Sequence, residues 1–152
     1  MAFKLVVEAF AYGETVPDRY TCQGPDLAPP LRWEAEPQGT QSFALIMDDP
    51  DAPAGTWNHW LLFDIPPTVH SLPEGHKAGQ DSVSGTNDFG KLGYGGPCPP
   101  RGHGPHRYFF KLFALDVPGL KLPRGAKRAD IDRALRTHIL GEAQYMGKYE
   151  RN

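Results

Sequence analysis

The sequence reads RYFFKLFAL at residues 107–115, and this is its strongest apolar run. Odd and even positions of the run are both apolar, which is typical of a strand buried on both faces of a sheet. Shorter apolar runs at 42–47 and 59–65 predict two more strands, and further strands are expected at 31–33 and 143–151. At 3–10, apolar residues alternate with Lys4 and Glu8, so this segment predicts a half-buried strand.

The chain has 17 glycines and 16 prolines and no repeat, which predicts many turns between short strands. Residues 68–105 have almost no periodicity and predict a long loop region, functional or flexible. A helix is expected around Ile131, Leu135 and Ile139, which recur every four residues, with Gly141 ending it. We therefore predict one domain over residues 1–152, mainly β, a sandwich of antiparallel sheets with a short helix in its C-terminal region.

The charge balance is close to neutral, with 16 basic and 18 acidic residues and a net charge of -2. This balance argues against general attraction to nucleic acids or acidic membranes, so no nucleic-acid partner is expected. The N-terminal segment contains Glu8 and no long apolar run, and it is interpreted as a first strand instead of a secretory signal. No stretch approaches the length of a membrane span, and a cytoplasmic location is expected.

Asp49 and Asp51 flank Pro50 directly after the run at 42–47. In an extended segment the two carboxylates would point the same way, and Pro50 and Pro53 would hold them rigidly. The alternative is a turn in which the aspartates bond nearby backbone amides. The segment lacks the spaced oxygen ligands and the terminal glutamate of a calcium loop, so no metal is assigned to it.

Two histidines stand where apolar runs begin: His59 and His106. Strand ends beside glycine-rich loops are where binding sites are usually built, which makes both histidines candidates. For His59, a hydrogen-bonded structural role is the alternative.

Motifs for catalysis are weak. His103 and His106 are separated by Gly104 and Pro105, which predict a turn, and no third metal ligand is suitably spaced. No Gly-x-Ser-x-Gly motif occurs, and Cys98 is crowded by prolines without an orienting third group. We therefore assign no catalytic residue, no metal and no cofactor.

The two cysteines, Cys22 and Cys98, are far apart and neither belongs to a CxxC pair. A zinc or redox motif is poorly supported for this reason. A disulfide between them requires that their two loops meet, which the sequence leaves open.

Taken together, six segments resemble the phosphatidylethanolamine-binding protein family, and more narrowly its bacterial and archaeal Raf-kinase-inhibitor-like branch. They are Tyr20-Thr21-Cys22-x-Gly24 with Pro29-Pro30-Leu31-x-Trp33, Asp49-Pro50-Asp51-Ala52-Pro53, Trp57-x-His59-Trp60, Asn87-Asp88-Phe89-Gly90, Gly95-Gly96-Pro97-Cys98-Pro99-Pro100 and Gly104-x-His106-Arg107-Tyr108. The resemblance implies a β-sandwich of two antiparallel sheets with a small anion pocket at one end.

The resemblance also implies the pocket residues and their ligand. The implied ligand-binding set is Asp49, Asp51, Pro53, His59, Gly96, Pro100, His106 and Tyr108. Family members bind phosphate-like head groups there, so small phosphate or carboxylate anions and phosphoethanolamine head groups are the expected ligands. A histidine beside Asp49 is expected to have a raised pKa, which would make the pocket a histidinium site near neutral pH.

Two departures from eukaryotic members limit what the resemblance transfers. The insert before His59 is shorter here, because only residues 54–56 separate the Asp-Pro-Asp-Ala-Pro motif from the Trp57 motif. Eukaryotic members also have a C-terminal tail that helps to gate the pocket, whereas this chain stops at Asn152. A resemblance in the pocket alone is therefore not enough to predict that this protein binds a kinase.

Three functions remain open at this point. The favoured one is a head-group binding protein with a regulatory role toward a kinase or protease partner. The second is a hydrolase or lyase in which His59 and His106 act as acid and base. The third is a protease inhibitor or scaffold that acts through a surface loop. A homodimer is also expected, through an apolar patch on loops 57–67 and 95–105.

Overall fold

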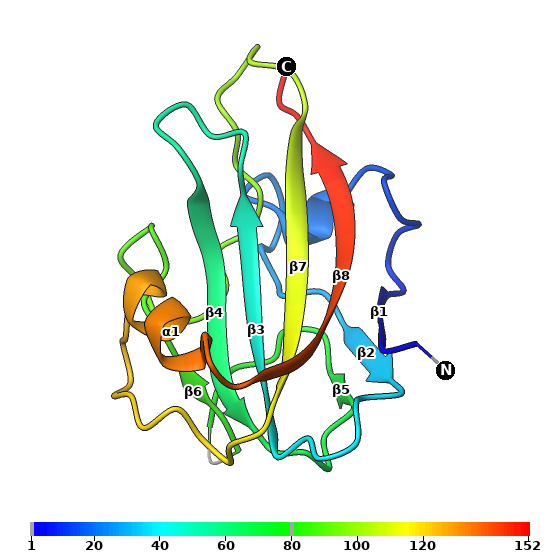
Figure 1. Ribbon diagram of the computed structural model, residues 1–152. Helices are drawn as coiled ribbons and strands as arrows, with labels where there is room; N and C mark the ends of the chain where they lie inside the picture. The colour runs from blue at the N-terminus through cyan, green and yellow to red at the C-terminus, as the bar shows by residue number, and fades with distance from the viewer. Residues whose placement is uncertain (1, 80) are drawn as a thin grey trace.

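The computed structural model describes residues 2–79 and 81–152, and two antiparallel sheets form its framework (Figure 1). The larger sheet has the strand order β6-β4-β3-β7-β8, and the smaller has the order β1-β2-β5. The predicted fold class, a mainly β sandwich with one short helix, is confirmed. The elements along the chain are β1 (Lys4–Val7), η1 (Asp18–Tyr20), β2 (Leu31–Glu34), β3 (Ser42–Asp49), β4 (Trp57–Ile65), β5 (Ser71–Leu72), β6 (Val83–Ser84), β7 (His106–Leu115), α1 (Arg128–Leu135) and β8 (Ile139–Tyr149).

Strand β3 lies between β4 and β7 and is buried at every position. Leu45 faces the core between the two sheets, whereas its neighbour Ile46 faces a second core that includes Ile131 of α1. β7 follows the same rule, because Phe110 belongs to the first core and Leu115 to the second. Apolar residues at both parities therefore reflect a sheet that is covered on both faces.

The antiparallel pairing brings distant parts of the chain to one end of the larger sheet. Because β4 and β7 both run opposite to β3, the end of β3 lies beside the starts of its two neighbours. Asp49 is paired with Trp57 at the start of β4, and Asp48 with Phe109 near the start of β7. This end is at the top of Figure 1, where the C-terminus also lies.

The helix prediction was wrong at its C-terminal boundary. α1 ends at Leu135, and Ile139, expected on the buried face of a helix, is 41% exposed at the start of β8. Gly141 does not end a helix but is paired with Ala114 inside the ladder between β7 and β8. The four-residue spacing from Leu135 to Ile139 suggests a continuous helix, but pairing of residues 139–149 with β7 places Ile139 in a strand instead.

The region 68–105 is mainly loop, as expected, and its described residues include only the two-residue strands β5 and β6. The region contributes one strand to each sheet, because β5 pairs with β2 in the smaller sheet and β6 pairs with β4 in the larger. In the part of the chain that the structure describes, no helix is long and apolar enough to cross a membrane.

Replacing Gly141 by alanine tests its position in β8. Alanine normally stabilises a strand relative to glycine. Here an added Cβ would stand 2.8 Å from the Pro37 Cγ atom, and we expect Gly141→Ala to lower the free energy of unfolding by about 1–2 kcal/mol. Urea denaturation measures the change. Gly79→Ala is the control, since a Cβ there meets nothing within 4 Å. A Gly141→Ala protein as stable as the control would contradict the packing.

Candidate functional site

A cavity of about 190 Å³ lies at the end of the sandwich where β3 stops and β4 and β7 begin. Six residues of the predicted set line it: Asp49, Pro53, His59, Pro100, His106 and Tyr108. The remaining wall is formed by Ala52, Trp57, Phe89, Cys98 and Pro99. Asp51 and Gly96 do not line this cavity, although both were expected there.

Asp49 and His106 form a buried pair at the base of the site. Asp49 is 3% exposed and His106 is 2% exposed. The His106 Nδ1–H group donates to the Asp49 Oδ2 atom at 2.6 Å, and the Asp51 amide donates to Oδ1 at 2.8 Å. The turn alternative for the Asp-Pro-Asp segment therefore holds for Asp49, and each of its oxygens already has a protein donor.

The Asp51 carboxylate points away from Asp49 and binds Arg107. It accepts hydrogen bonds from the Arg107 backbone amide at 2.9 Å, from Nε at 2.9 Å and from Nη2 at 2.8 Å. These contacts with the guanidinium lower the pKa of Asp51 to about 2. The expectation that both aspartates face one site was wrong, because a turn after Asp49 replaces the extended backbone that it assumed.

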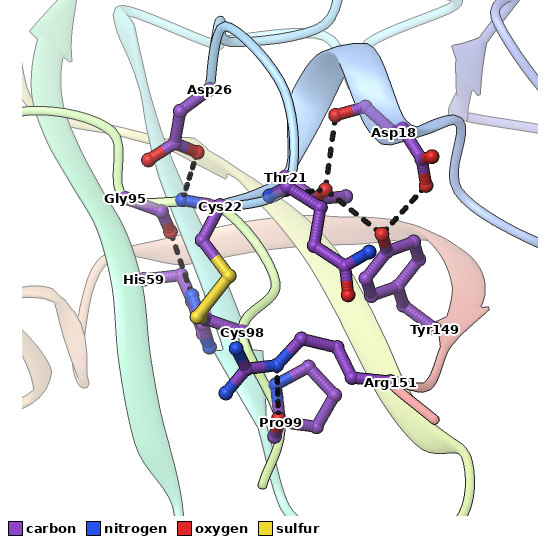
Figure 2. Close-up of a disulfide and its surroundings, with 12 residues drawn as sticks. Asp18, Thr21, Cys22, Asp26, His59, Gly95, Cys98, Pro99, Tyr149 and Arg151 are labelled. Atoms are coloured by element: carbon purple, nitrogen blue, oxygen red, sulfur yellow. Dashed lines mark hydrogen bonds between the residues drawn. A yellow bond between two sulfur atoms is a disulfide. The ribbon is translucent and has the colours of Figure 1, made fainter. Parts of the chain in front are cut away.

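His59 is held in one tautomer. Its Nδ1 atom lies 2.6 Å from the Gly95 carbonyl oxygen (Figure 2), and because that oxygen can only accept, Nδ1 carries the proton. In the neutral ring Nε2 is therefore an acceptor. Burial lowers the pKa of His59 and outweighs the opposing effects of the Gly95 carbonyl and the Asp49 carboxylate. The expectation of a cationic histidine near Asp49 is wrong for His59.

Two hydrogen-bond donors in the cavity wall are buried without a partner among the described residues. They are the Tyr108 hydroxyl and the Trp57 Nε1–H group. Burial and the nearby Asp49 carboxylate raise the pKa of Tyr108 far above its usual value, so the hydroxyl keeps its proton. Buried donors normally find a partner in proteins. Their presence in one wall indicates a place for an acceptor from outside the chain.

Gly96 has a structural role in place of the expected contact with an anion. Its amide donates to the Asp26 Oδ1 atom at 2.9 Å. A Cβ atom at this position would stand 2.1 Å from the Tyr20 carbonyl oxygen, so only glycine allows the two loops to approach this closely.

A disulfide between Cys22 and Cys98 joins the loop after η1 to the wall of the cavity (Figure 2). The two Cα atoms are 5.4 Å apart, a normal separation for a disulfide. The Cys22 amide also donates to the Pro97 carbonyl oxygen at 3.1 Å. On the other side, the Arg151 Nε–H group donates to the Pro99 carbonyl oxygen at 2.7 Å. The wall around Cys98 is thus held from both sides.

The opposite face of the same strands carries a network of charges. Asp48, next to Asp49, is 2% exposed and accepts hydrogen bonds from Lys111 at 3.0 Å and from Arg128 of α1 at 2.9 Å. Arg128 also donates to the Asn58 Oδ1 atom at 2.8 Å, and Asn58 precedes His59. Side chains of neighbouring strand residues point to opposite faces, so α1 anchors the strands behind the cavity.

Sequence reasoning did not place Trp57, Phe89 and Cys98 in the wall. The position of Trp57 could have been inferred from the sequence, because it stands two residues before His59 and residues two apart in a strand share one face. Phe89 packs edge-on against Trp57 and His59, with ring centroids 5.5 and 5.4 Å apart. It reaches them from a loop, for which no periodic pattern exists.

Comparison with known proteins identifies close relatives. The model of the phosphatidylethanolamine-binding protein family matches residues 6–150. A UPF0098 protein of Aquifex aeolicus is 52% identical over 147 residues, which cover 95% of this chain and 86% of that protein. Two crystal structures align over 99% of both chains with a TM-score of 0.92: the homologue CT736 of Chlamydia trachomatis, at 38% identity, and YbcL of Escherichia coli, at 34%.

Loss of the disulfide should destabilise the protein. The bridge joins residues 76 positions apart, and a chain-entropy model gives it about 4 kcal/mol of stabilisation. We expect Cys22→Ser/Cys98→Ser to lose a large part of this, measured by urea denaturation. Addition of a thiol reductant to wild-type protein should reproduce the loss and leave the double variant unchanged. Equal stability of all samples would show that the bridge does not form in solution.

Proposed function

Because the chain belongs to the phosphatidylethanolamine-binding protein family, we propose that its cavity binds small phosphate-like anions such as the phosphoethanolamine head group. The observation that carries the proposal is the buried Tyr108 hydroxyl, which has no partner among the described residues and belongs to a residue of the cavity wall. A phosphate oxygen would accept this hydrogen bond, and the Trp57 Nε1–H group offers a second donor in the same wall.

Among the described residues that line the cavity there is no lysine or arginine, so the charge of the ligand has to be low. The Asp49 carboxylate opposes a dianion, although both of its oxygens already have donors. The neutral His59 ring offers Nε2 as an acceptor. A phosphate monoester that keeps one proton satisfies this arrangement, because its P–OH group donates to His59 while another oxygen accepts from Tyr108. Small carboxylic acids share the pattern of one donor and one acceptor.

The size of the cavity supports a head group as the ligand. Its volume of about 190 Å³ is below the range of about 300–1,000 Å³ that is usual for sites of drug-sized ligands. Its walls include Pro53, Pro99, Pro100 and Phe89. Proline has no backbone N–H, so the three prolines exclude water and leave the hydrogen bonds to the ligand to other residues of the wall.

Several expectations from the sequence stay predictions. They are regulation of a kinase or a protease, acid–base turnover by His59 and His106, the homodimer and the cytoplasmic location. The disulfide bears on the location, since such bridges are typical of oxidising compartments and of intracellular proteins from hyperthermophiles. Release of product from a phosphoester substrate would separate turnover from binding.

The Tyr108 hydroxyl gives the sharpest test of binding. We expect Tyr108→Phe to weaken the binding of phosphoethanolamine by about ten- to hundredfold, the value of a hydrogen bond to a charged acceptor. Stability should not fall, because the hydroxyl has no partner in the free protein. Calorimetric titration measures the affinity, and urea denaturation measures the stability.

Tyr94→Phe is the matched control for this test. The Tyr94 hydroxyl donates to the Tyr20 carbonyl oxygen at 2.7 Å, outside the cavity. Its loss should cost about 1 kcal/mol of stability and leave the affinity unchanged. Equal affinities of the Tyr108→Phe protein and wild type would overturn the proposed site.

The affinity for a phosphate monoester should depend on pH through the loss of the ligand's own P–OH proton. Since burial lowers the pKa of His59, its ring is neutral at pH 7 and accepts from the ligand. As pH rises through the second pKa of a phosphate monoester, about 6, the P–OH proton is lost and affinity should fall by about tenfold. Sulfate has no proton in this range, and its affinity should stay level. A parallel fall for both anions, measured by calorimetry, would mean that a protein histidinium carries the binding instead.

A further inference from the structure

His106 has neither ring nitrogen free for a ligand in this structure. Its Nδ1–H group is bound to Asp49, and its Nε2 atom lies 2.6 Å from the Nδ1 atom of His103. The two imidazole rings have centroids 4.8 Å apart. One proton lies between the two facing nitrogens, because a hydrogen bond between imidazoles needs one donor and one acceptor.

His103 differs from His106 in burial and in backbone setting. His106 is buried in β7, whereas His103 is exposed and lies in the loop before that strand. Its neighbours Gly102 and Gly104 both have positive φ angles, of 73° and 87°, a conformation that glycine adopts without strain. Because His103 is exposed and lies outside β7, rotation of its side chain leaves the pairing of the strand that holds His106 intact.

A second hollow lies on the outer side of His106. It has a volume of about 430 Å³ and is lined by Asp51, His103, Pro105, His106, Arg107 and Lys148. Arg107 is neutralised by Asp51 at 2.8 Å, whereas Lys148 is exposed and has no carboxylate within 4 Å in the described part of the chain. The hollow therefore offers an anion a positive charge beside His103. His106 lines both hollows.

We infer that His103 is an exchangeable partner of His106, and that a bound phosphate-like anion takes its place at the Nε2 atom. The inference rests on the proposed function and adds a residue that limits its affinity. A phosphate that keeps a proton has both a P–OH donor and anionic acceptor oxygens, so it can replace His103 at Nε2 whichever of the two nitrogens holds the shared proton. As an acceptor, an anionic oxygen is stronger than a neutral imidazole nitrogen. The anion must nevertheless replace the existing bond, so His103 lowers the affinity of the site.

Removal of His103 should therefore tighten binding. The replaced contact is a single hydrogen bond, so His103→Ala is expected to bind inorganic phosphate about two- to tenfold more tightly than wild type in calorimetric titrations. His138→Ala is the matched control. His138 is partly exposed and also paired, with Asp116 at 2.9 Å, but it lies beyond the opposite end of β7 and should leave the affinity unchanged.

Nitrogen NMR of the histidine side chains gives a readout without ligand. His103→Ala should move the His106 Nε2 resonance in the free protein, and phosphate should move it in wild type. Unchanged or weaker phosphate binding by His103→Ala, or an unmoved Nε2 resonance, would overturn the exchange while leaving the proposed function intact. Absence of phosphate binding in wild type and in His103→Ala would overturn both.

Discussion

The Asp49 carboxylate accepts one hydrogen bond from the turn that follows it and one from His106, and the site depends on this double contact. Through Oδ1 it fixes the Asp51 amide, and through Oδ2 it fixes the imidazole at the start of β7. Asp51 in turn binds Arg107, the next residue of β7. The two acids that flank Pro50 thus hold two consecutive residues of a strand more than fifty positions away. A buried carboxylate is tolerated here because its oxygens are satisfied.

The strands that carry the site have the cavity on one face and a network of charged side chains on the other. Toward the cavity, Asp49 and His59 stand among apolar walls. On the other face, Asp48 and Asn58 share Arg128. Removing one member of such a buried network leaves a charge without its partner, which costs far more than the intact network contributes. The helix therefore stabilises the rear of the site even though it makes no contact with the cavity.

The fold was largely predictable from the sequence because sheet burial leaves a local pattern. The run at 107–115 indicated a strand covered on both faces, and the structure shows it between two cores. The boundary after Leu135 was not predictable, since its spacing with Ile139 fits a helix and only the pairing with β7 decides otherwise. Local patterns fail where a contact between distant segments determines the conformation.

In the candidate site too, features set by local sequence were predictable and features set by contacts between distant segments were not. Four of its predicted residues, Asp49, His59, His106 and Tyr108, lie near strand ends, where the sequence motifs placed them. The charge of His59 depends on its burial and on a carbonyl from another loop, neither of which is visible in its neighbours along the chain. The contact between His103 and His106 likewise depends on how a turn folds back. The disulfide depends on the meeting of two loops 76 residues apart.

The last residues of the chain belong to the scaffold of the cavity. Arg151 donates to the Pro99 carbonyl oxygen and accepts from the Gly102 amide, so it supports the loop on both sides of Pro100. Any polypeptide attached after Asn152 begins at the rim of the site. A surface-capture tag or a fluorescent fusion placed there would disturb the contacts of Arg151 with the loop around Pro100, and with them the site that it is meant to report on. Attachment before β1, which lies elsewhere on the molecule in Figure 1, leaves that rim untouched.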